Sequence, residues 1–337
     1  MRIAIVTDAW FPQVNGVVRT LSRVKRELQT MDHAVTVISP DLFTNLPCPT
    51  YPEIRLAVLP GRGVRLRLDE AAPDAIHIAT EGPLGWAARG YCRRRGQPFT
   101  TSFHTRFPEY VHARSGIPPG WLYRLLRRFH GAGEGIMVAT RTIRRDLETR
   151  GFDNIRDWTR GVDTELFRPR ELISETTSLT SLPRPIHLYV GRVAVEKNIG
   201  AFLALDLPGS KVVVGDGPQR KQLAGEHPNV VFTGAKHGEE LARHYADADV
   251  FVFPSRTDTF GLVLLEAMAA GVPVAAYPVP GPLDVVDGSG AGVLHDDLKT
   301  AATEALAIPR ETCRDHAMTY SWQRCAQQFL DNLAPFR

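Results

Sequence analysis

Short apolar runs alternate with segments of helical period along the first half of the chain. Each run has the length of a β-strand and is separated from the next by a helix-like pattern or by a turn containing proline or glycine. The runs occupy residues 3–6, 34–38, 75–78, 99–102 and 135–139. Strands that alternate with helices predict a mainly parallel sheet, whose functional site lies at the carboxyl ends of the strands.

The same alternation restarts after a polar interruption. Residues 174–178 are all polar, and the interruption ends in Pro183, Arg184 and Pro185. Further strand-like runs occupy residues 187–190, 211–214, 230–232, 250–253 and 272–276. Because 337 residues suit two domains of about 150 residues better than one doubly wound sheet, we predict an α/β protein with two Rossmann-like domains. The first spans residues 1–170, a linker spans 171–184, and the second spans 185–318.

The charge of the chain is divided unevenly between its halves. Hydrophobic residues make up 43% and charged residues 23% of the sequence, as in ordinary soluble globular proteins. Residues 1–170 carry 26 Lys and Arg against 17 Asp and Glu, a net charge of +9, whereas the remainder carries 14 against 20, a net charge of −6. This asymmetry predicts an anionic partner for the N-terminal half, either a membrane surface or an acidic acceptor. No nucleic-acid partner is expected.

Neither the N-terminal segment nor the cysteines indicate a particular function. Met1 leads directly into the first apolar run, without the pattern of a signal peptide, and no stretch of about 18 apolar residues occurs, so a cytoplasmic or peripheral membrane protein is expected. The cysteines form no Cys-x-x-Cys pair and have no histidine at metal-ligand spacing, so neither a disulfide framework nor a zinc site is predicted. They are Cys48, Cys92, Cys313 and Cys325.

Glycine-rich turns follow strands in both halves. The first strand lacks the Gly-x-Gly-x-x-Gly pattern that a dinucleotide-binding dehydrogenase needs. In the second half, residues 215–218 read GDGP directly after a strand. That turn is equally consistent with a plain strand-to-helix connection and with a ligand loop.

The segment with the most chemical information is residues 254–268, PSRTDTFGLVLLEAM. A strand precedes it, and the apolar run after the glycine opens a helix. The backbone N–H groups of Phe260, Gly261 and Leu262 would then point out of the helix N-terminus, where they favour an anion or a polyhydroxylated ligand. Glu266, about one turn inside the helix, can accept hydrogen bonds from two vicinal ribose hydroxyls. The alternative is a helix whose glutamate is merely solvated.

This segment resembles the acidic-x7-Glu motif of the retaining glycosyltransferases of family 4, with Asp258 where most members have glutamate. Other segments that resemble the family follow in order along the chain. They are FPQVNGVV at 11–18, SFHT at 102–105, RGVDTELF at 160–167, GRVAVEKN at 191–198, GDGP at 215–218 and FTG at 232–234. The N-terminal segments are similar to the branch that includes sulfoquinovosyl and mannosyl transferases of glycolipid synthesis.

The resemblance assigns roles to individual residues. Arg192 and Lys197 lie five positions apart after a strand, where two cations can converge on the diphosphate leaving group and stabilise its growing charge. The resemblance adds Gly16, whose loop approaches the donor phosphates, and His104, near the transferred sugar. Asp258 has one methylene less than glutamate, so its carboxylate reaches less far toward a sugar hydroxyl or contacts it from a different position. The identity of the sugar therefore stays open.

The resemblance implies the GT-B architecture, in which two Rossmann-like domains face each other across a cleft. It also implies that residues 319–337 form a helix that crosses back to the N-terminal domain. The expected reaction moves a hexose from a nucleoside diphosphate sugar, with UDP favoured and GDP-mannose open, to a glycolipid or diacylglycerol-type acceptor with retention of configuration. The oligomeric state and the linkage stay open.

Other functions remain open from the sequence. They are a non-catalytic nucleotide-sugar-binding protein, a transferase with a soluble or polysaccharide acceptor, and a sugar-nucleotide epimerase or phosphorylase. Asp247 and Asp249 spell the Asp-x-Asp of metal-dependent transferases, but they stand at a predicted helix end before a strand. We therefore expect no metal or other cofactor.

Residues 118–130, PPGWLYRLLRRFH, combine an apolar stripe with basic residues. Arg124, Arg127 and Arg128 alternate with aromatic and leucine side chains at helical spacing. Such a helix suits the interface of an anionic membrane. An amphipathic helix packed on its own sheet has the same pattern. The residues of the expected apolar stripe are Trp121, Leu122, Leu125, Leu126 and Phe129.

Overall fold

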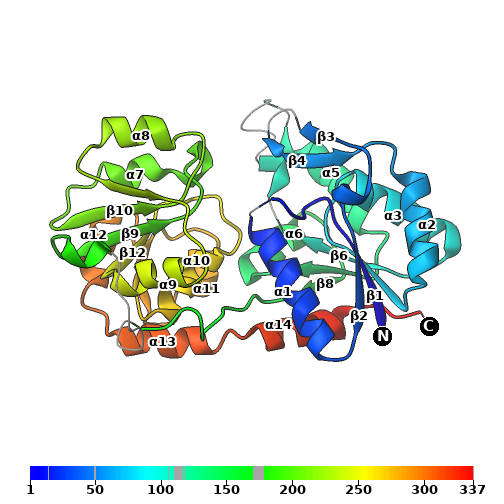
Figure 1. Ribbon diagram of the computed structural model, residues 1–337. Helices are drawn as coiled ribbons and strands as arrows, with labels where there is room; N and C mark the ends of the chain where they lie inside the picture. Colours follow the sequence, from blue (N-terminus) through cyan, green and yellow to red (C-terminus); the bar gives the residue numbers. More distant parts are fainter. Residues whose placement is uncertain are drawn as a thin grey trace. The chain divides into compact units, whose positions relative to one another are not determined.

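The computed structural model describes residues 1–13, 15–48, 51–104, 106–109, 116, 118–169 and 178–336. The chain divides into two compact units (Figure 1). The first unit comprises Met1–Arg160 together with Trp322–Arg337, and the second comprises Gly161–Ser321. Residues 161–169 therefore belong to the second unit, although the sequence pattern predicts them in the first domain. Most of the expected linker, residues 171–177, lies outside the described residues.

The first unit is built on a six-stranded parallel sheet in the order β2-β1-β5-β6-β7-β8. A separate antiparallel hairpin is inserted after β2, and the predicted strands do not include it. The sheet strands are β1 (Arg2–Val6), β2 (Ala34–Ile38), β5 (Ala75–Ile78), β6 (Thr100–Phe103), β7 (Gly135–Val138) and β8 (Ile155–Asp157), and the hairpin strands are β3 (Asn45–Cys48) and β4 (Tyr51–Ala57). The helices are α1 (Gly16–Thr30), α2 (Gly61–Ala71), α3 (Pro83–Arg95), α5 (Pro119–His130), α6 (Arg141–Thr149) and α14 (Trp322–Asn332).

The second unit repeats the doubly wound plan. Its six strands are parallel in the order β11-β10-β9-β12-β13-β14, so the chain starts near the middle of the sheet and reverses direction between β9 and β12. The strands are β9 (Ile186–Val190), β10 (Ser210–Val214), β11 (Val231–Gly234), β12 (Val250–Phe253), β13 (Val274–Ala276) and β14 (Gly292–Leu294). Helical elements are η3 (Ser178–Ser181), η4 (Val195–Lys197), α7 (Ile199–Leu203), α8 (Arg220–Glu226), α9 (Gly238–Asp247), α10 (Leu262–Ala269), α11 (Pro282–Val285), α12 (Leu298–Ala305) and α13 (Arg310–Met318). Two parallel α/β units confirm the predicted fold class.

Local sequence signals account for where α1 begins. The side chain of Asn15 accepts hydrogen bonds from the N–H groups of Val17 and Val18, each at 3.0 Å, and so satisfies two donors that the first turn leaves without helical partners. The apolar stripe of α1, which includes Leu21 and Leu28, is buried. Gly16 is thereby fixed as the first residue of a helix that is packed on the unit.

The last helix of the chain completes the first unit. α14 packs against α1, and the indole Nε1 of Trp158 donates to the carbonyl of Cys325 at 3.1 Å. The ring of Phe329 is fully buried between His77, at a centroid distance of 4.8 Å, and Trp158, at 5.2 Å. The segment after β8 is therefore held by a helix that lies far from it in the sequence.

We expect Phe329→Ala to lower the free energy of unfolding of the first unit by about 3–5 kcal/mol, because it empties a fully buried aromatic site. Chemical denaturation followed by Trp fluorescence measures the change. Gln327→Ala, on the exposed face of the same helix, is the control and is expected to change it by less than about 0.5 kcal/mol. Equal effects of the two substitutions would contradict a structural role for α14 in this unit.

Candidate functional site

The loop after β12 and the start of α10 are shaped by Gly261. This residue precedes the first helical residue, Leu262, and has a φ of +82°. A Cβ there would lie 3.0 Å from a methyl carbon of Leu264, so both the conformation and the packing favour glycine. Phe260 is buried and packs edge-on against Tyr320 at 6.4 Å. The first turn of α10 is thus fixed at the carboxyl end of the sheet, as the sequence predicts.

Glu266 lies on the second turn of α10 and is only 3% exposed. The hydroxyl of Tyr245, on α9, donates to its Oε2 at 3.0 Å. The ring of Tyr245 is itself held between Phe167, at 5.6 Å, and Phe251, at 5.8 Å. Because the Glu266 side chain is buried, the alternative of a merely solvated glutamate is wrong. A buried carboxylate is unfavourable without hydrogen bonds, and Tyr245 supplies one. Tyr245 was not identified from the sequence, since nothing in the spacing of the two residues links them.

Lys197 and Asp258 form an ion pair in the second unit. The Nζ of Lys197 lies 2.6 Å from Oδ1 of Asp258, and both side chains are mostly buried. The loops that carry them are joined by further bonds: Asn198 donates to the carbonyl of Pro254 at 3.0 Å, and Thr257 donates to the carbonyl of Glu196 at 3.1 Å. The structure therefore brings together two predicted site residues that lie 61 positions apart.

Arg192 lies on the loop after β9, the same loop that leads to Lys197. Its Nη1 is 3.9 Å from a carboxylate oxygen of Glu196, and its side chain is 39% exposed. Its carbonyl accepts a hydrogen bond from Tyr189 at 2.9 Å. Each of the two predicted cations thus faces a carboxylate in this structure, at the carboxyl edge of the sheet.

Three strand-to-helix loops of the second unit are packed backbone against backbone. The N–H of Gly191 donates to the carbonyl of Val214 at 3.0 Å, and the N–H of Gly215 donates to that of Gly234 at 2.9 Å. A Cβ on Gly215 would lie 1.8 Å from the carbonyl oxygen of Gly191, and one on Gly217 would lie 2.4 Å from that of Val193. The GDGP turn is therefore glycine-rich because the loop that carries Arg192 lies directly against it.

His104 and Gly16 lie in the first unit: His104 directly follows β6, and Gly16 begins α1, the helix that follows β1. The Nδ1 of His104 lies 3.3 Å from Nη2 of Arg160, and its ring meets Trp158 edge-on at 5.7 Å. Burial, reinforced by the charge of Arg160, holds the pKa of His104 well below its usual value. Val14 and Thr105, which belong to two of the matched segments, lie outside the described residues.

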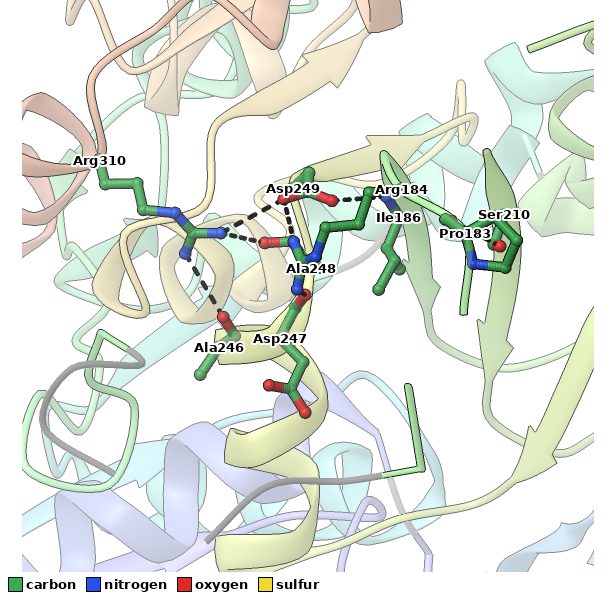
Figure 2. A network of polar contacts seen from close by, with 9 residues as sticks. All are labelled: Pro183, Arg184, Ile186, Ser210, Ala246, Asp247, Ala248, Asp249 and Arg310. Carbon is green, nitrogen blue, oxygen red and sulfur yellow. Dashed lines mark hydrogen bonds and ion pairs between the residues drawn. The ribbon is translucent and has the colours of Figure 1, made fainter. Parts of the chain in front are cut away.

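Asp249 fixes the amino edge of the second sheet (Figure 2). Its Oδ2 accepts from the N–H of Ile186 at 2.6 Å, and its carboxylate pairs with Arg184. Figure 2 shows Arg184 and Arg310 converging on the end of α9, where Arg184 donates to the carbonyl of Asp247 at 3.0 Å. Positive side chains at a helix C-terminus satisfy its last carbonyls. The Asp-x-Asp sequence therefore has a structural explanation.

This amino edge also carries a hollow of about 480 Å³, lined in part by Arg184, Asp249 and Arg310. It lies at the ends of the strands opposite to those where the predicted site residues gather. Over the described ranges of the chain, no group of three His, Cys, Asp or Glu side chains is arranged to hold a metal ion.

The fold and these motifs define a glycosyltransferase of the GT-B architecture. The chain belongs to glycosyltransferase family 4: residues 14–166 match the family model "Glycosyltransferase Family 4", and residues 184–308 match "Glycosyl transferases group 1". Together the two matches cover most of both units.

Similar proteins agree with this assignment. The chain is 31% identical over 320 residues to a GDP-mannose-dependent alpha-mannosyltransferase of Mycobacterium tuberculosis, covering 87% of this chain and 83% of that one. It is 30% identical over 364 residues to a sulfoquinovosyl transferase of Arabidopsis thaliana, covering 96% and 71%. Among solved structures, a sucrose-phosphate synthase from Thermosynechococcus elongatus has the same fold, with a TM-score of 0.78 at 21% identity over 98% of this chain and 97% of that one.

We expect Gly215→Ala to destabilise the second unit by about 2–4 kcal/mol, because the new methyl group would both strain the backbone and displace the loop at Gly191. Differential scanning calorimetry measures the loss. Gly225→Ala is the matched control, since nothing lies within 4 Å of its added Cβ and alanine in the helix α8 is worth about 0.5–1 kcal/mol over glycine. A Gly215→Ala protein as stable as wild type would show that the loops can separate freely.

Proposed function

We propose that this glycosyltransferase moves a hexose from a nucleoside diphosphate sugar to a membrane glycolipid or diacylglycerol-type lipid, with retention of configuration. The observation that carries the donor half is the gathering of Arg192, Lys197, Glu266 and the N-terminus of α10 at one edge of the second sheet. From the sequence we favour UDP as the nucleotide, whereas the mycobacterial relative is named for GDP-mannose, so both bases belong in the test.

In the proposed reaction the diphosphate gains negative charge as the bond to the sugar breaks. Arg192 and Lys197 stabilise that charge, and the first-turn N–H groups of α10 add fixed dipoles directed toward it. Asp258 holds Lys197 in place until the donor binds, and it then contacts a hydroxyl of the sugar. Glu266, fixed by Tyr245, accepts from the ribose. Because cations and dipoles already neutralise the diphosphate, the reaction needs no metal.

The first unit supplies the acceptor side in this proposal. His104 lies beside the transferred sugar, and the loop at Gly16 approaches the donor phosphates. No described helix has both the length and the apolar character to cross a bilayer. We place the enzyme in the cytoplasm, with the first unit docked on the inner face of the membrane.

Purified protein incubated with labelled UDP- or GDP-hexoses and a lipid extract is expected to form a labelled lipid, with equal rates in the presence and absence of EDTA. A donor at a hundred times its dissociation constant should stabilise the fold by about 2.7 kcal/mol in a thermal-shift panel. Donor binding without transfer to any lipid, soluble sugar or polysaccharide would favour a nucleotide-sugar-binding protein instead. Activity that EDTA abolishes and magnesium restores would refute the metal-free reaction.

Arg192→Ala and Lys197→Ala are each expected to lower turnover by about a hundredfold or more, because the developing charge loses a fixed cation. Glu266→Ala should first weaken the binding of free nucleoside diphosphate, measured by calorimetry. Lys299→Ala is the control, because it removes a cation from an exposed ion pair with Asp206 and is expected to leave turnover unchanged. Near-wild-type turnover in both cation variants would remove them from the site.

The basic helix α5 divides its apolar residues between the core and the surface. Leu126 and Phe129 are buried, so these members of the expected membrane-facing stripe belong to the core instead. Trp121 and Leu125 remain exposed, at 68% and 48%. The guanidinium of Arg124 lies over the Trp121 ring at 5.4 Å. The surface that supports membrane docking is therefore a narrower strip than the sequence pattern indicates.

A second apolar and basic surface lies between β4 and α2. Leu59 is 92% exposed in a left-handed conformation with a φ of +47°. Leu66 is also exposed, beside the exposed Arg62 and Arg65 on α2. An exposed leucine in an uncommon backbone conformation is a second candidate membrane anchor. It lies outside the single interfacial helix that the sequence predicts.

Wild-type protein is expected to sediment with vesicles rich in anionic phospholipid at low salt, and Arg124, Arg127 and Arg128 changed together to Gln should weaken binding on the order of 100-fold, at roughly 1 kcal/mol per cation. The matched control changes Arg93, Arg94 and Arg95, at the exposed end of α3, to Gln for the same loss of charge. Equal weakening would indicate diffuse attraction, and no binding by wild type would favour a soluble acceptor.

A further inference from the structure

Arg160 is a buried cation in the first unit. It is only 4% exposed, and burial lowers its pKa to about 10, so it stays protonated at neutral pH. Its Nη1 donates to the carbonyls of Trp158 at 2.6 Å and Thr159 at 3.0 Å, and its guanidinium lies 4.4 Å from the centre of the Trp158 ring. Within the part of the chain that the structure describes, it has no carboxylate partner. A buried charge without a carboxylate partner lowers the stability of the fold.

A further contact of Arg160 defines the protonation state of the His104 ring. Nη2 lies 3.3 Å from Nδ1 of the imidazole. A guanidinium has only donors, so Nδ1 must be the acceptor. A neutral imidazole has one acceptor nitrogen, and the ring proton therefore sits on Nε2. An imidazolium would place a second N–H against the guanidinium, so this geometry excludes the charged ring.

The position of Arg160 is set by the last helix of the chain. Trp158, over which its guanidinium lies, donates to the carbonyl of Cys325 on α14 at 3.1 Å. The neighbouring Thr159 receives a bond from the Cys325 thiol at 3.1 Å and donates through its N–H to Gln328 at 2.9 Å. The segment that carries the cation is thus fixed on both sides of its backbone.

Three other titratable groups in the described part of the first unit, His77, His130 and Cys325, are engaged elsewhere. His77 contacts Thr100 at 2.9 Å and Ser102 at 2.8 Å through its two ring nitrogens. His130 contacts Thr101 at 2.8 Å and Glu81 at 3.1 Å. Cys325 is buried, and burial raises the pKa of its thiol to about 12. Of these groups and Arg160, it is Arg160 that bonds to the His104 ring directly.

We propose that Arg160 is a positioning residue that fixes His104 as a neutral imidazole with its proton on Nε2. The inference rests on the proposed function for one point, that His104 lies beside the transferred sugar. The ring is then a hydrogen-bond donor toward a sugar oxygen and cannot act as a base through Nε2. Nothing in the segment RGVDTELF indicates this role from the sequence alone.

The tautomer is tested directly by NMR on full-length protein carrying ¹⁵N-labelled histidine, without nucleotide or acceptor. His104→Gln identifies the ring signals of His104. The expected result is a protonated Nε2 and an unprotonated Nδ1 throughout about pH 6–8, the range over which an ordinary histidine loses its charge. A wild-type ring with its proton on Nδ1, or one that becomes charged within that range, would overturn the proposal.

Variants test the role in catalysis. Arg160→Met is expected to lower kcat at least about tenfold, with the KM for the donor within about threefold of wild type, and to raise the pKa of His104, because the nearby positive charge is removed while burial remains. Arg156→Met is the matched control, because Arg156 also donates to two backbone carbonyls, of Asn332 at 2.5 Å and Glu134 at 3.0 Å, without contacting His104. Unchanged kcat in a folded Arg160→Met protein would refute the positioning role.

Three variants keep the test decisive if Arg160→Met fails to fold. Arg160→Lys keeps the charge but cannot span the carbonyls and the ring together, so it should also lower kcat. His104→Gln, whose amide nitrogen reaches the position of Nε2, should retain more activity than His104→Asn, and the reverse order would contradict an Nε2 donor. Wild-type protein that transfers no sugar would defeat the proposed function, whereas the NMR result would still decide the tautomer.

Discussion

Direct contact between backbones of neighbouring loops is the constraint on which the second unit depends. Gly215 lies so close to Gly191 that a Cβ on Gly215 would clash with the Gly191 carbonyl oxygen, and Gly234 extends the arrangement to a third strand. With no flexible side chains between them, the loops act as one surface. The cations on the first of these loops are therefore placed by the whole carboxyl edge of the sheet, and the ion pair of Lys197 with Asp258 links this surface to the loop that opens α10.

The first unit achieves rigidity differently. Its sheet residues near His104 are polar but buried, and hydroxyl groups on β6 satisfy the buried imidazoles on β5 and α5. Such a network is stable only when each member has a partner. Arg160 adds a positive charge to it: burial, reinforced by that charge, lowers the pKa of His77 to about 3, so this imidazole is neutral at physiological pH.

The sequence predicted the fold class, and it also predicted that the candidate residues of the second unit lie at the carboxyl edge of the sheet, because both depend on local patterns. Apolar runs mark the central strands, and glycine with a following apolar run marks the start of α10. The edge strands β8 and β14, each of three residues, are too short for a periodic signal. Arg160 and Tyr245 were missed as partners of His104 and Glu266 for a different reason: their contacts depend on tertiary packing between segments 56 and 21 residues apart. The prediction that the apolar stripe of α5 faces the membrane can hold for only part of the stripe. Periodicity alone does not say which of two adjacent apolar rows faces the core.

The return of α14 to the first unit has a consequence for the newly made chain on the ribosome. The segment ending at Arg160 emerges before all of Gly161–Ser321, while the helix that covers Trp158 comes last. At about 5–20 residues per second, the site for Phe329 stays uncovered for roughly 10–30 seconds after its other wall has been synthesised. The second unit, which is continuous in sequence, can finish folding in that interval. The N-terminal unit is therefore the later of the two to mature, and its exposed aromatic surface is the part of the nascent protein most open to chaperones or to aggregation.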